Sequence, residues 1–326
     1  MTDVSTTGGS MSREPTRWGF GSPGPLRDEL TALAFGGGKV VTSSLLADYE
    51  IEGEPVDQPG DIGILLDSAD APVATVEDVL SKVIRLADMT DQDAVDEGEG
   101  YADAAAFRLT HERFWNGYID EVREGIGDPG FTITDDTPIV VERFRIIGIL
   151  AADGSPITPV VRPAYPPDRP AVDAFLADRN ADVVARLGEV VDARRRPALI
   201  VEADGVIEGV LTWELSGTSM EVLTLHAARQ WSGVGTALIA AARRVAEASG
   251  ARRLWLITTN DNVDGLRFYQ RRGFRLARLH PGAVDRSRET LKPAIPEVGD
   301  HGIPLRDELE LETLIHQNTP VPDEPD

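Results

Sequence analysis

The sequence predicts an α+β protein with two domains, and three observations support this fold class. The chain has 326 residues, and globular domains typically contain about 100–200 residues each. Strand-like runs and helix-like segments are mixed along the chain, and a hairpin turn joins two of the strands. The stretch AADGSPI at residues 151–157 lies between two strand-like runs and has the small, polar composition of an exposed linker.

Composition limits the class of protein. The hydrophobic fraction of 41% is ordinary for a globular chain, and no apolar run approaches the roughly 18 residues that span a bilayer. Residues 1–16 are polar and lack the apolar core of a secretory signal, so we expect a disordered leader. The chain has no cysteine, which excludes disulfides and thiolate metal sites and fits a cytoplasmic protein. We expect no bound metal and no membrane partner.

The negative charge is concentrated in the first half of the chain. The whole chain has a net charge of -23, and residues 1–150 contain 29 acidic and 11 basic residues, a net charge of -18. Nonspecific nucleic-acid binding depends on lysine and arginine neutralising phosphates. We therefore expect no long nucleic acid as a partner, although a pocket for one nucleotide is compatible with this charge.

The first domain is predicted over residues 17–150. A helix is expected at 24–35, followed by the turn Gly36–Gly38, and Pro59–Asp61 forms a turn before a strand. The remaining predicted elements are strands at 62–67, 73–82 and 138–150 and helical segments at 90–96 and 102–124. This mixture is typical of a compact α+β domain.

The second domain is predicted over residues 158–315. Asp204-Gly205 is a hairpin signal between two strands, which favours antiparallel pairing. Gly250 and Gly273 each end a helix. The predicted strands are 158–161, 198–203, 206–215, 220–226, 253–258, 274–279 and 305–314, and the predicted helices are 235–249 and 263–272, with a further helical region in 167–194. The acidic, proline-rich tail at 316–326 is expected to be disordered.

A glycine loop opens the helix at 235–249 and indicates a phosphate site. A strand runs into Gln230-x-x-Gly233-x-Gly235. The first turn of a helix has unpaired N–H groups and the positive end of the dipole, and glycine lets a pyrophosphate come close to them. Gly-x-Gly alone also suits a plain tight turn. A dinucleotide-binding turn requires parallel βαβ units, which the hairpin-joined strands do not favour.

Together with Asn262-x5-Phe268-Tyr269-x3-Gly273-Phe274, this loop resembles the GNAT superfamily of acetyltransferases. The resemblance implies a mixed, mostly antiparallel sheet flanked by helices, acetyl-CoA as cosubstrate, and transfer of an acetyl group to a primary amine. It implies that backbone groups of Thr224, Leu225 and His226 pair with the pantetheine arm and that Asn262 lines its path. The residues that it places around the pyrophosphate are Gln230, Trp231, Ser232, Gly233, Val234, Gly235 and Thr236.

The same resemblance suggests an acid for the leaving thiolate. Tyr269 takes this role by its motif position, and core packing is its alternative. Glu221 and His226 lie on the strand before the loop, and either can accept the amine proton directly or through water. The alternatives are that Glu221 is solvated and that His226 contributes only backbone contacts, and an amine that binds in its neutral form needs no base.

Acceptor recognition is expected from the variable parts of this domain. The long segment 280–304 contains cations suited to an acceptor carboxylate, and an ordinary surface loop is the alternative. These cations are Arg286, Arg288, Lys292 and His301. The region 167–194 is expected to form another wall of the groove. Small-molecule amines, peptide or protein N-termini, and aminated nucleosides all remain candidate acceptors.

The first domain resembles the ASCH family, a small β-barrel fold similar to RNA-binding PUA domains. The motifs are Gly37-x-Lys39-x-x-Thr42, Pro59-Gly60-Asp61 and Ala94-x-x-Glu97-Gly98-Glu99-Gly100, with Trp18-Gly19-Phe20 and Phe107-x3-His111-x2-Phe114. Some members are N4-acetylcytidine amidohydrolases, and others bind RNA. The resemblance implies Thr42 as nucleophile, Lys39 as its activator or an oxyanion stabiliser, and Glu97, or Glu99 in its place, as proton shuttle. A ligand-binding or structural barrel without turnover is the alternative.

The two resemblances leave three functional hypotheses. The main one is an N-acetyltransferase with an appended ASCH domain that binds or hydrolyses a modified nucleoside. The alternative is an RNA- or nucleoside-binding protein, or an N4-acetylcytidine amidohydrolase-like protein, whose GNAT half senses acetyl-CoA. In the third, one half installs an acetyl group that the other removes.

Overall fold

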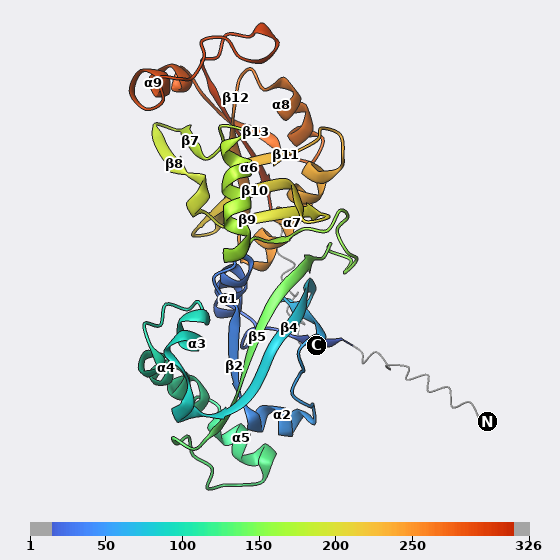
Figure 1. Ribbon diagram of the computed structural model, residues 1–326, viewed down its shortest axis with the longest axis vertical. Helices are drawn as coiled ribbons and strands as arrows, with labels where there is room; N and C mark the ends of the chain where they lie inside the picture. Colours follow the sequence, from blue (N-terminus) through green and yellow to red (C-terminus); the bar gives the residue numbers. More distant parts are fainter. Residues whose placement is uncertain (1–14, 316–326) are drawn as a thin grey trace, which may run out of the picture.

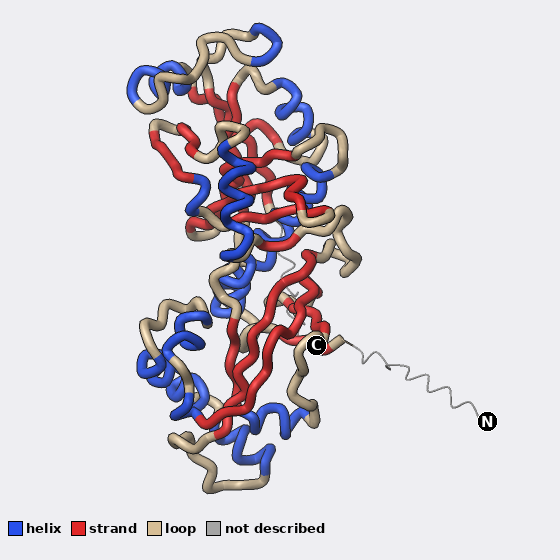
Figure 2. The backbone as a smooth tube through the Cα atoms, viewed as in Figure 1, coloured by secondary structure: helices blue, strands red, loops and turns tan. Residues whose placement is uncertain are grey.

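The computed structural model of the protein describes residues 15–315. The predicted leader, apart from Pro15 and Thr16, and the predicted tail lie outside the described residues. Figure 1 shows two sheets that follow one another along the long axis of the molecule, each with its own helices. Helices and strands are mixed in both halves (Figure 2), so the predicted α+β class is confirmed.

The N-terminal half is built on an open half-barrel of five strands in the order β1-β3-β4-β5-β2. The strands are β1 (Thr16–Trp18), β2 (Val41–Leu45), β3 (Ile62–Leu66), β4 (Pro72–Arg85) and β5 (Pro138–Ile149). The pair β1–β3 is parallel and the other ladders are antiparallel. The helices are α1 (Pro25–Phe35), α2 (Leu46–Glu52), α3 (Asp91–Asp96), α4 (Ala104–Asn116) and α5 (Ile119–Ile126).

Two features of this half differ from the sequence prediction. The helical segment at 102–124 is two helices, because α4 ends at Asn116, with Gly117 as its C-cap residue, and α5 begins at Ile119. Strands β1 and β2 and helix α2 were not predicted. The β2 sequence VTSSL has only two apolar ends around three polar residues, which is a weak strand pattern. Its pairing with β5 along five residues holds it in the sheet.

The C-terminal half is a seven-stranded sheet in the order β13-β14-β12-β11-β10-β9-β6. The strands are β6 (Arg162–Pro163), β9 (Ala198–Ala203), β10 (Val206–Ser216), β11 (Ser219–Ala227), β12 (Arg253–Thr259), β13 (Arg275–His280) and β14 (Glu308–Leu314). Only the β11–β12 ladder of this sheet is parallel, which confirms the mixed, mostly antiparallel prediction. Its helices are α6 (Arg169–Ala177), α7 (Val234–Ala248), α8 (Val263–Gln270) and α9 (Ala283–Thr290).

The helical region predicted at 167–194 is only partly helical. Helix α6 is followed by a separate hairpin of β7 (Val183–Arg186) and β8 (Glu189–Asp192). The turn residues Leu187 and Gly188 both have positive φ angles, of 50° and 81°, as two-residue hairpin turns require. The predicted strand at 158–161 is also wrong, because pairing with β9 begins only at Arg162.

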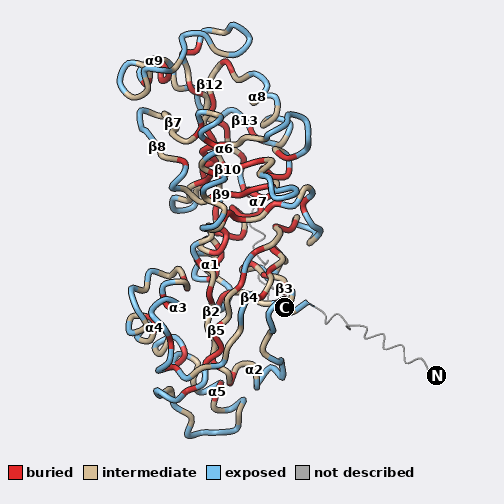
Figure 3. Tube along the Cα trace, viewed as in Figure 1, coloured by how far each residue is buried: buried red, intermediate tan, exposed pale blue. Residues whose placement is uncertain are grey.

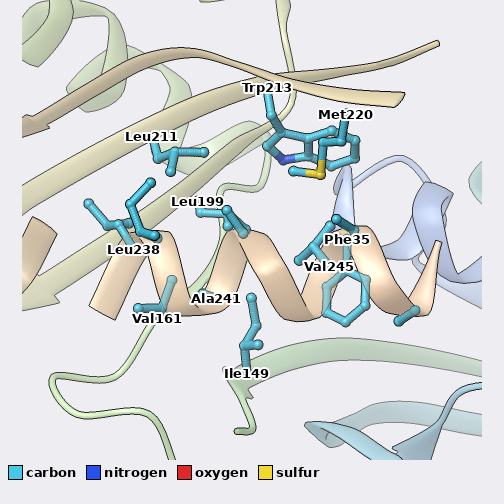
Figure 4. Packing of buried hydrophobic residues seen from close by; sticks show 14 of the residues in the cluster. Phe35, Ile149, Val161, Leu199, Leu211, Trp213, Met220, Leu238, Ala241 and Val245 are labelled. Carbon is cyan, nitrogen blue, oxygen red and sulfur yellow. The ribbon is translucent and has the colours of Figure 1, made fainter. Parts of the chain in front are cut away.

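Helix α7 lies at the centre of a core that belongs to both halves. Figure 4 shows Val245 and Ala241 of α7 beside Phe35 of α1 and Ile149 of β5, with Trp213 of the C-terminal sheet nearby. All five side chains belong to one cluster of buried residues, and buried backbone lies on both sides of the junction in Figure 3. The two halves therefore pack as one hydrophobic unit.

Polar contacts also join the two halves, one of them through α7. Arg244, which is 8% exposed, donates a hydrogen bond of 3.1 Å to the carbonyl of Pro72. The Ile146 N–H donates to the Tyr165 hydroxyl oxygen over 2.7 Å. Gly37 has a φ of +72°, and a Cβ there would lie 2.7 Å from the carbonyl oxygen of Ala164. The first domain thus supports the helix whose N-terminus faces the candidate site.

A buried carboxylate in the half-barrel predicts a pH-dependent stability. Burial raises the pKa of Glu142 to about 7, the Tyr49 hydroxyl lowers it, and the carboxylates of Asp57 and Asp78 raise it further. Glu142 Oε1 is buried without a hydrogen-bond partner within residues 15–315. Because the folded-state pKa lies above the unfolded one, this group's contribution is most favourable at acidic pH and is lost as pH rises through about 7.

We expect Glu142→Gln to raise the free energy of unfolding by about 1–3 kcal/mol near pH 8 and to change it little near pH 5, because the neutral amide removes a buried charge. Urea unfolding at both pH values measures the difference. Glu50→Gln, at an exposed position of α2, is the control. An equal effect at both pH values would contradict the assignment.

Candidate active site

The sheet of the C-terminal half opens between β11 and β12. Their parallel ladder pairs Ser219–Val222 with Arg253–Leu256 and then ends. Strand β11 continues to Ala227 but pairs beyond this point only with β10, and β12 continues to Thr259 paired with β14. The backbone of residues 223–227 therefore has one edge without a strand partner, which can pair with an extended ligand.

A β-bulge lies where the two strands separate. In the β10–β11 ladder, Thr212 pairs with Thr224 and Trp213 with Val222, so Leu223 is the extra residue. A bulge redirects the side chains that follow it. Val222 packs in the core with α7, and after the bulge Leu225 does so too, so Thr224 and His226 point to the opposite face of the sheet. The Thr212 and Thr224 hydroxyls are hydrogen-bonded over 2.7 Å on that face.

The N-terminus of α7 faces this opening. Gly233 is the N-cap residue with a φ of +86°, a conformation that glycine adopts without cost. The first helical hydrogen bond from this cap runs from Ala237 N–H to Gly233 O, so the first-turn amides before Ala237 have no partner inside the helix. A Cβ at Gly235 would touch the Phe268 ring at 3.4 Å, so glycine there lets α7 and α8 approach closely.

A cavity of about 860 Å³ joins the opening to the helix N-terminus. It contains predicted residues from both motifs, with the exposed Trp231 at its rim. The lining residues are Leu225, His226, Ala227, Arg229, Gln230, Trp231, Ser232, Gly233, Gly235, Thr236, Thr259, Asp261, Asn262, Asp264, Gly265, Arg267, Phe268, Tyr269, Arg271, Arg272 and Asp300. Of the predicted cofactor residues, Thr224 and Val234 are not in this lining: both are buried beside it.

Tyr269 lies in the cavity wall. Its ring packs edge-on against Phe268 and Phe274, with centroid distances of 5.1 and 5.7 Å. Burial raises the pKa of its hydroxyl to about 12, so the hydroxyl keeps its proton at neutral pH. No hydrogen bond of this hydroxyl is found within residues 15–315. A protonated, unpartnered donor in the wall can hydrogen-bond a ligand or donate a proton.

Asn262 caps α8 as well as lining the cavity. Its side-chain oxygen accepts from Gly265 N–H over 2.9 Å, and its amide nitrogen donates to the Thr258 hydroxyl over 2.8 Å. The side chain is thus held between β12 and α8. Its direct role is to fix the start of the helix that carries Tyr269.

Glu221 lies outside the cavity lining, on the face of β11 opposite α7. It is 5% exposed and contacts Arg186 at the end of β7, with Arg186 Nη2 donating to its Oε2 over 2.8 Å. Burial raises the pKa of Glu221 to about 7, and the Arg186 guanidinium lowers it. Burial and the positive charge of Arg179 lower the pKa of His226, so this ring is neutral near pH 7.

The cations of segment 280–304 are engaged by the chain itself. Arg288 donates to the carbonyls of Ile295, Pro296 and Leu305 and pairs with Asp285 at 2.6 Å. Lys292 donates to the Val183 carbonyl over 2.9 Å, which ties the segment to the β7–β8 hairpin. The remaining two, Arg286 and His301, contact Pro281 O and Asp264. Lys292 thus holds the segment against the hairpin, and the other three cations are engaged elsewhere in the chain.

The N-terminal half holds a second cluster of polar side chains, around Lys39. Lys39 and Glu97 are each 1% exposed and lie 2.5 Å apart, and Lys39 is 2.6 Å from Glu99. Burial raises the pKa of Glu97 to about 7, and the Lys39 ammonium lowers it. The Tyr101 hydroxyl donates to Glu99 over 2.9 Å. A buried pair of this kind is costly unless each charge is satisfied, as it is here.

The hydroxyl that contacts this cluster belongs to Ser43, whose Oγ donates to Glu97 Oε1 over 2.7 Å. Thr42 is the next residue along β2, so its side chain points to the other face of the sheet. There it lies opposite Glu142 in the β2–β5 ladder. The structure therefore brings together Lys39, Glu97 and Glu99, but not Thr42. Thr42 and Ser43 are adjacent hydroxyl residues on one strand, and the sequence does not indicate which of them faces Lys39 and Glu97.

Family models match both halves of the chain. The ASCH domain matches residues 16–148, and the acetyltransferase (GNAT) family matches residues 163–274. Two proteins of Bacillus subtilis are similar to part of the chain. The uncharacterized protein YdhI is 41% identical over 109 residues, which is 33% of this chain and 68% of that protein. The uncharacterized protein YxbD is 41% identical over 106 residues, 32% of this chain and 66% of that protein.

Solved structures resemble each half separately. An ASCH domain from Lactobacillus crispatus has 21% identity and a TM-score of 0.35, covering 40% of this chain and 78% of that one. An IAA acetyltransferase from Bacillus cereus has 22% identity and a TM-score of 0.36, covering 48% of this chain and 98% of that one.

Proposed function

The chain is an ASCH domain followed by a GNAT-family acetyltransferase domain, and from this we propose that it is an acetyl-CoA-dependent N-acetyltransferase that acts on a primary amine. The proposal rests on one observation: a cavity connects the open edge of β11 to the glycine-rich N-terminus of α7. A ligand with an extended amide arm and a pyrophosphate fits this combination, and coenzyme A has both.

The two ends of the site suit the two ends of coenzyme A. The pyrophosphate lies on the free amides at the start of α7, where the helix dipole favours an anion. The pantetheine arm pairs with the backbone of residues 223–227, beside the bulge at Leu223. The thioester then lies near Tyr269, which approaches the cavity from α8.

The reaction requires two proton movements. The amine nitrogen attacks the thioester carbonyl, the carbon–sulfur bond of the resulting tetrahedral intermediate breaks, and the amide keeps the acetyl group. Tyr269, protonated at neutral pH because its pKa is about 12, supplies a proton to the leaving thiolate. Glu221 accepts the amine's proton, directly or through water, from the face of β11 opposite α7.

This role for Glu221 predicts the pH dependence of the rate. Its carboxylate accepts a proton only when ionised, so kcat/KM should rise as pH increases through about 7 and then level off. We expect Glu221→Gln to lower kcat/KM by about tenfold to a hundredfold and to remove this inflection. Initial rates between about pH 6 and pH 9 measure both effects.

Glu189→Gln is the matched control, because Glu189 also pairs with Arg186 but is mostly exposed at the hairpin. It should leave the inflection in place. An unchanged pH profile in Glu221→Gln would remove Glu221 from the mechanism and would favour an amine that binds in its neutral form.

A thiol-release assay with a panel of amines tests the proposed reaction. Small-molecule amines, peptides with free N-termini and aminated nucleosides cover the candidate acceptors. We expect turnover of one amine class, with one free CoA thiol released per acetylated amine. Acetyl-CoA binding without turnover of any amine would instead support a sensor of acetyl-CoA.

A second proposed activity concerns the ASCH domain. We propose that the Lys39 cluster binds a modified nucleoside, such as N4-acetylcytidine, or hydrolyses its amide. A specific observation favours a chemical site: a buried lysine and a serine hydroxyl both contact the same carboxylate, whose pKa is raised. Hydrolysis would transfer the acyl group to a hydroxyl and then to water, which releases acetate.

Two hydroxyl variants separate the candidate nucleophiles. Thr42 is implied by family resemblance, and Ser43 is implied by its contact with Glu97. Removal of the true nucleophile should abolish acetate release from N4-acetylcytidine, so we expect either Thr42→Val or Ser43→Ala, but not both, to do so. Chromatography of the nucleoside products measures it. Binding without any acetate release would leave a recognition site, and no saturable binding would contradict the nucleoside proposal.

A further inference from the structure

We propose that Arg267 and Arg271 of the C-terminal half form a subsite for the 3′-phosphate of coenzyme A, so that the protein discriminates acetyl-CoA from acetyl-dephospho-CoA. The inference rests on the proposed function and adds a specificity determinant to it. The two arginines are one turn apart on the exposed side of α8 and its C-cap. Both line the large cavity and a second hollow beside it.

The absence of acidic partners distinguishes this pair. The other two arginines of the cavity lining are engaged: Arg229 lies 3.5 Å from Glu208, and Arg272 donates to the Phe268 carbonyl and to the Thr236 hydroxyl. Within residues 15–315, the side chains of Arg267 and Arg271 form no ion pair and no hydrogen bond. Two exposed guanidinium groups without a carboxylate partner, in a chain of net charge -23, repel one another unless an anion lies between them.

Charge changes sign along the cavity wall. The acidic side chains Asp261, Asp264 and Asp300 lie around the start of α8. The Asp261 carboxylate accepts a hydrogen bond of 2.9 Å from the Asp300 N–H. The Asp264 carboxylate lies 3.4 Å from Nε2 of His301. The arginines lie at the other end of α8, the end that Arg272 ties to Thr236 in the first turn of α7.

The basic end of the wall is therefore the end next to the proposed pyrophosphate position. Coenzyme A carries its third phosphate on the ribose beyond the pyrophosphate, so this phosphate emerges on that side of α7. Arginine presents a planar fork of donors that matches a phosphate, and two forks can hold its two negative charges. Gln270 also lines the second hollow, but its amide nitrogen donates to the Leu266 carbonyl over 3.2 Å, so the two arginines are the donors offered to the phosphate.

Isothermal titration of the full-length protein with acetyl-CoA and with acetyl-dephospho-CoA tests the subsite. We expect the wild type to bind acetyl-dephospho-CoA about tenfold or more weakly, a ratio typical of lost charge-assisted hydrogen bonds. The double variant Arg267→Ala/Arg271→Ala should bind acetyl-CoA as weakly as the wild type binds acetyl-dephospho-CoA. It should therefore no longer distinguish the two ligands. Arg195→Ala, at an exposed position beyond the β7–β8 hairpin, should keep the wild-type preference.

The other outcomes of this titration overturn either the subsite or the proposed function. Equal binding of the two ligands by the wild type would overturn the subsite and leave the proposed function intact. A double variant that loses affinity for both ligands equally would place the arginines on the pyrophosphate and would also overturn it. A wild type that binds neither ligand would refute the proposed function itself.

Discussion

Gly233→Glu is expected to abolish acetyl-CoA binding, with at least a hundredfold rise in Kd, because it places an anion where the pyrophosphate must lie; like charges in contact cost several kcal/mol. The side chain has room, since no heavy atom lies within 4 Å of the position that its Cβ would take. The loss of affinity would therefore come from the negative charge and the volume of the glutamate side chain at the helix N-terminus. Isothermal titration with acetyl-CoA measures it.

The backbone cost of this substitution needs a matched control. Gly233 has a φ of +86°, and any side chain there is strained. Gly205, in the hairpin between β9 and β10, has a φ of +76° and is equally open. Gly205→Glu should lose similar thermal stability and retain acetyl-CoA affinity. If Gly233→Glu is folded and binds acetyl-CoA normally, the α7 N-terminus is not the phosphate site.

Tyr269→Phe is expected to lower kcat by about a hundredfold, the size of effect typical of losing a general acid. The KM for acetyl-CoA should change little, because the aromatic packing against Phe268 and Phe274 remains. The wild-type hydroxyl keeps its proton well above neutral pH, its pKa being about 12. The loss of kcat in Tyr269→Phe should therefore be the same at every pH near neutral. Steady-state rates in the thiol-release assay measure it.

Tyr118→Phe is a suitable control for this prediction. Its hydroxyl donates to Asp48 over 3.1 Å in the N-terminal half, and its loss should leave kcat unchanged. A Tyr269→Phe enzyme with wild-type kcat would show that another group, or water, protonates the thiolate. It would leave the acetyl-CoA site itself unaffected.

Local patterns predicted the elements around the cavity, whereas pairing over long distances had to come from the structure. The glycine loop, the helix after it and the Asn262 motif are contiguous signals, and each predicted element is present. The opening between β11 and β12 depends instead on where a parallel ladder ends. The residues of β11 after Val222 are as apolar as those before it, so nothing in their sequence marks this end.

The missed site residues have a common physical cause. Ser43 and Thr42 are adjacent polar residues on a short strand, and only the register with β5 decides which one reaches Glu97. Arg186 was missed because the β7–β8 hairpin was interpreted as helix, and its contact with Glu221 spans 35 residues. Arg267 and Arg271 had a visible i, i+4 spacing, but their lack of acidic partners is a property of the folded chain.

Isothermal titration of the wild-type protein with acetyl-CoA decides whether the C-terminal half holds a coenzyme A site. We expect saturable binding of one acetyl-CoA per chain, since the cavity joins the open edge of β11 to the N-terminus of α7. The absence of measurable binding by the folded protein would contradict it, because the loop at Gln230–Gly235 would then not be a coenzyme A site.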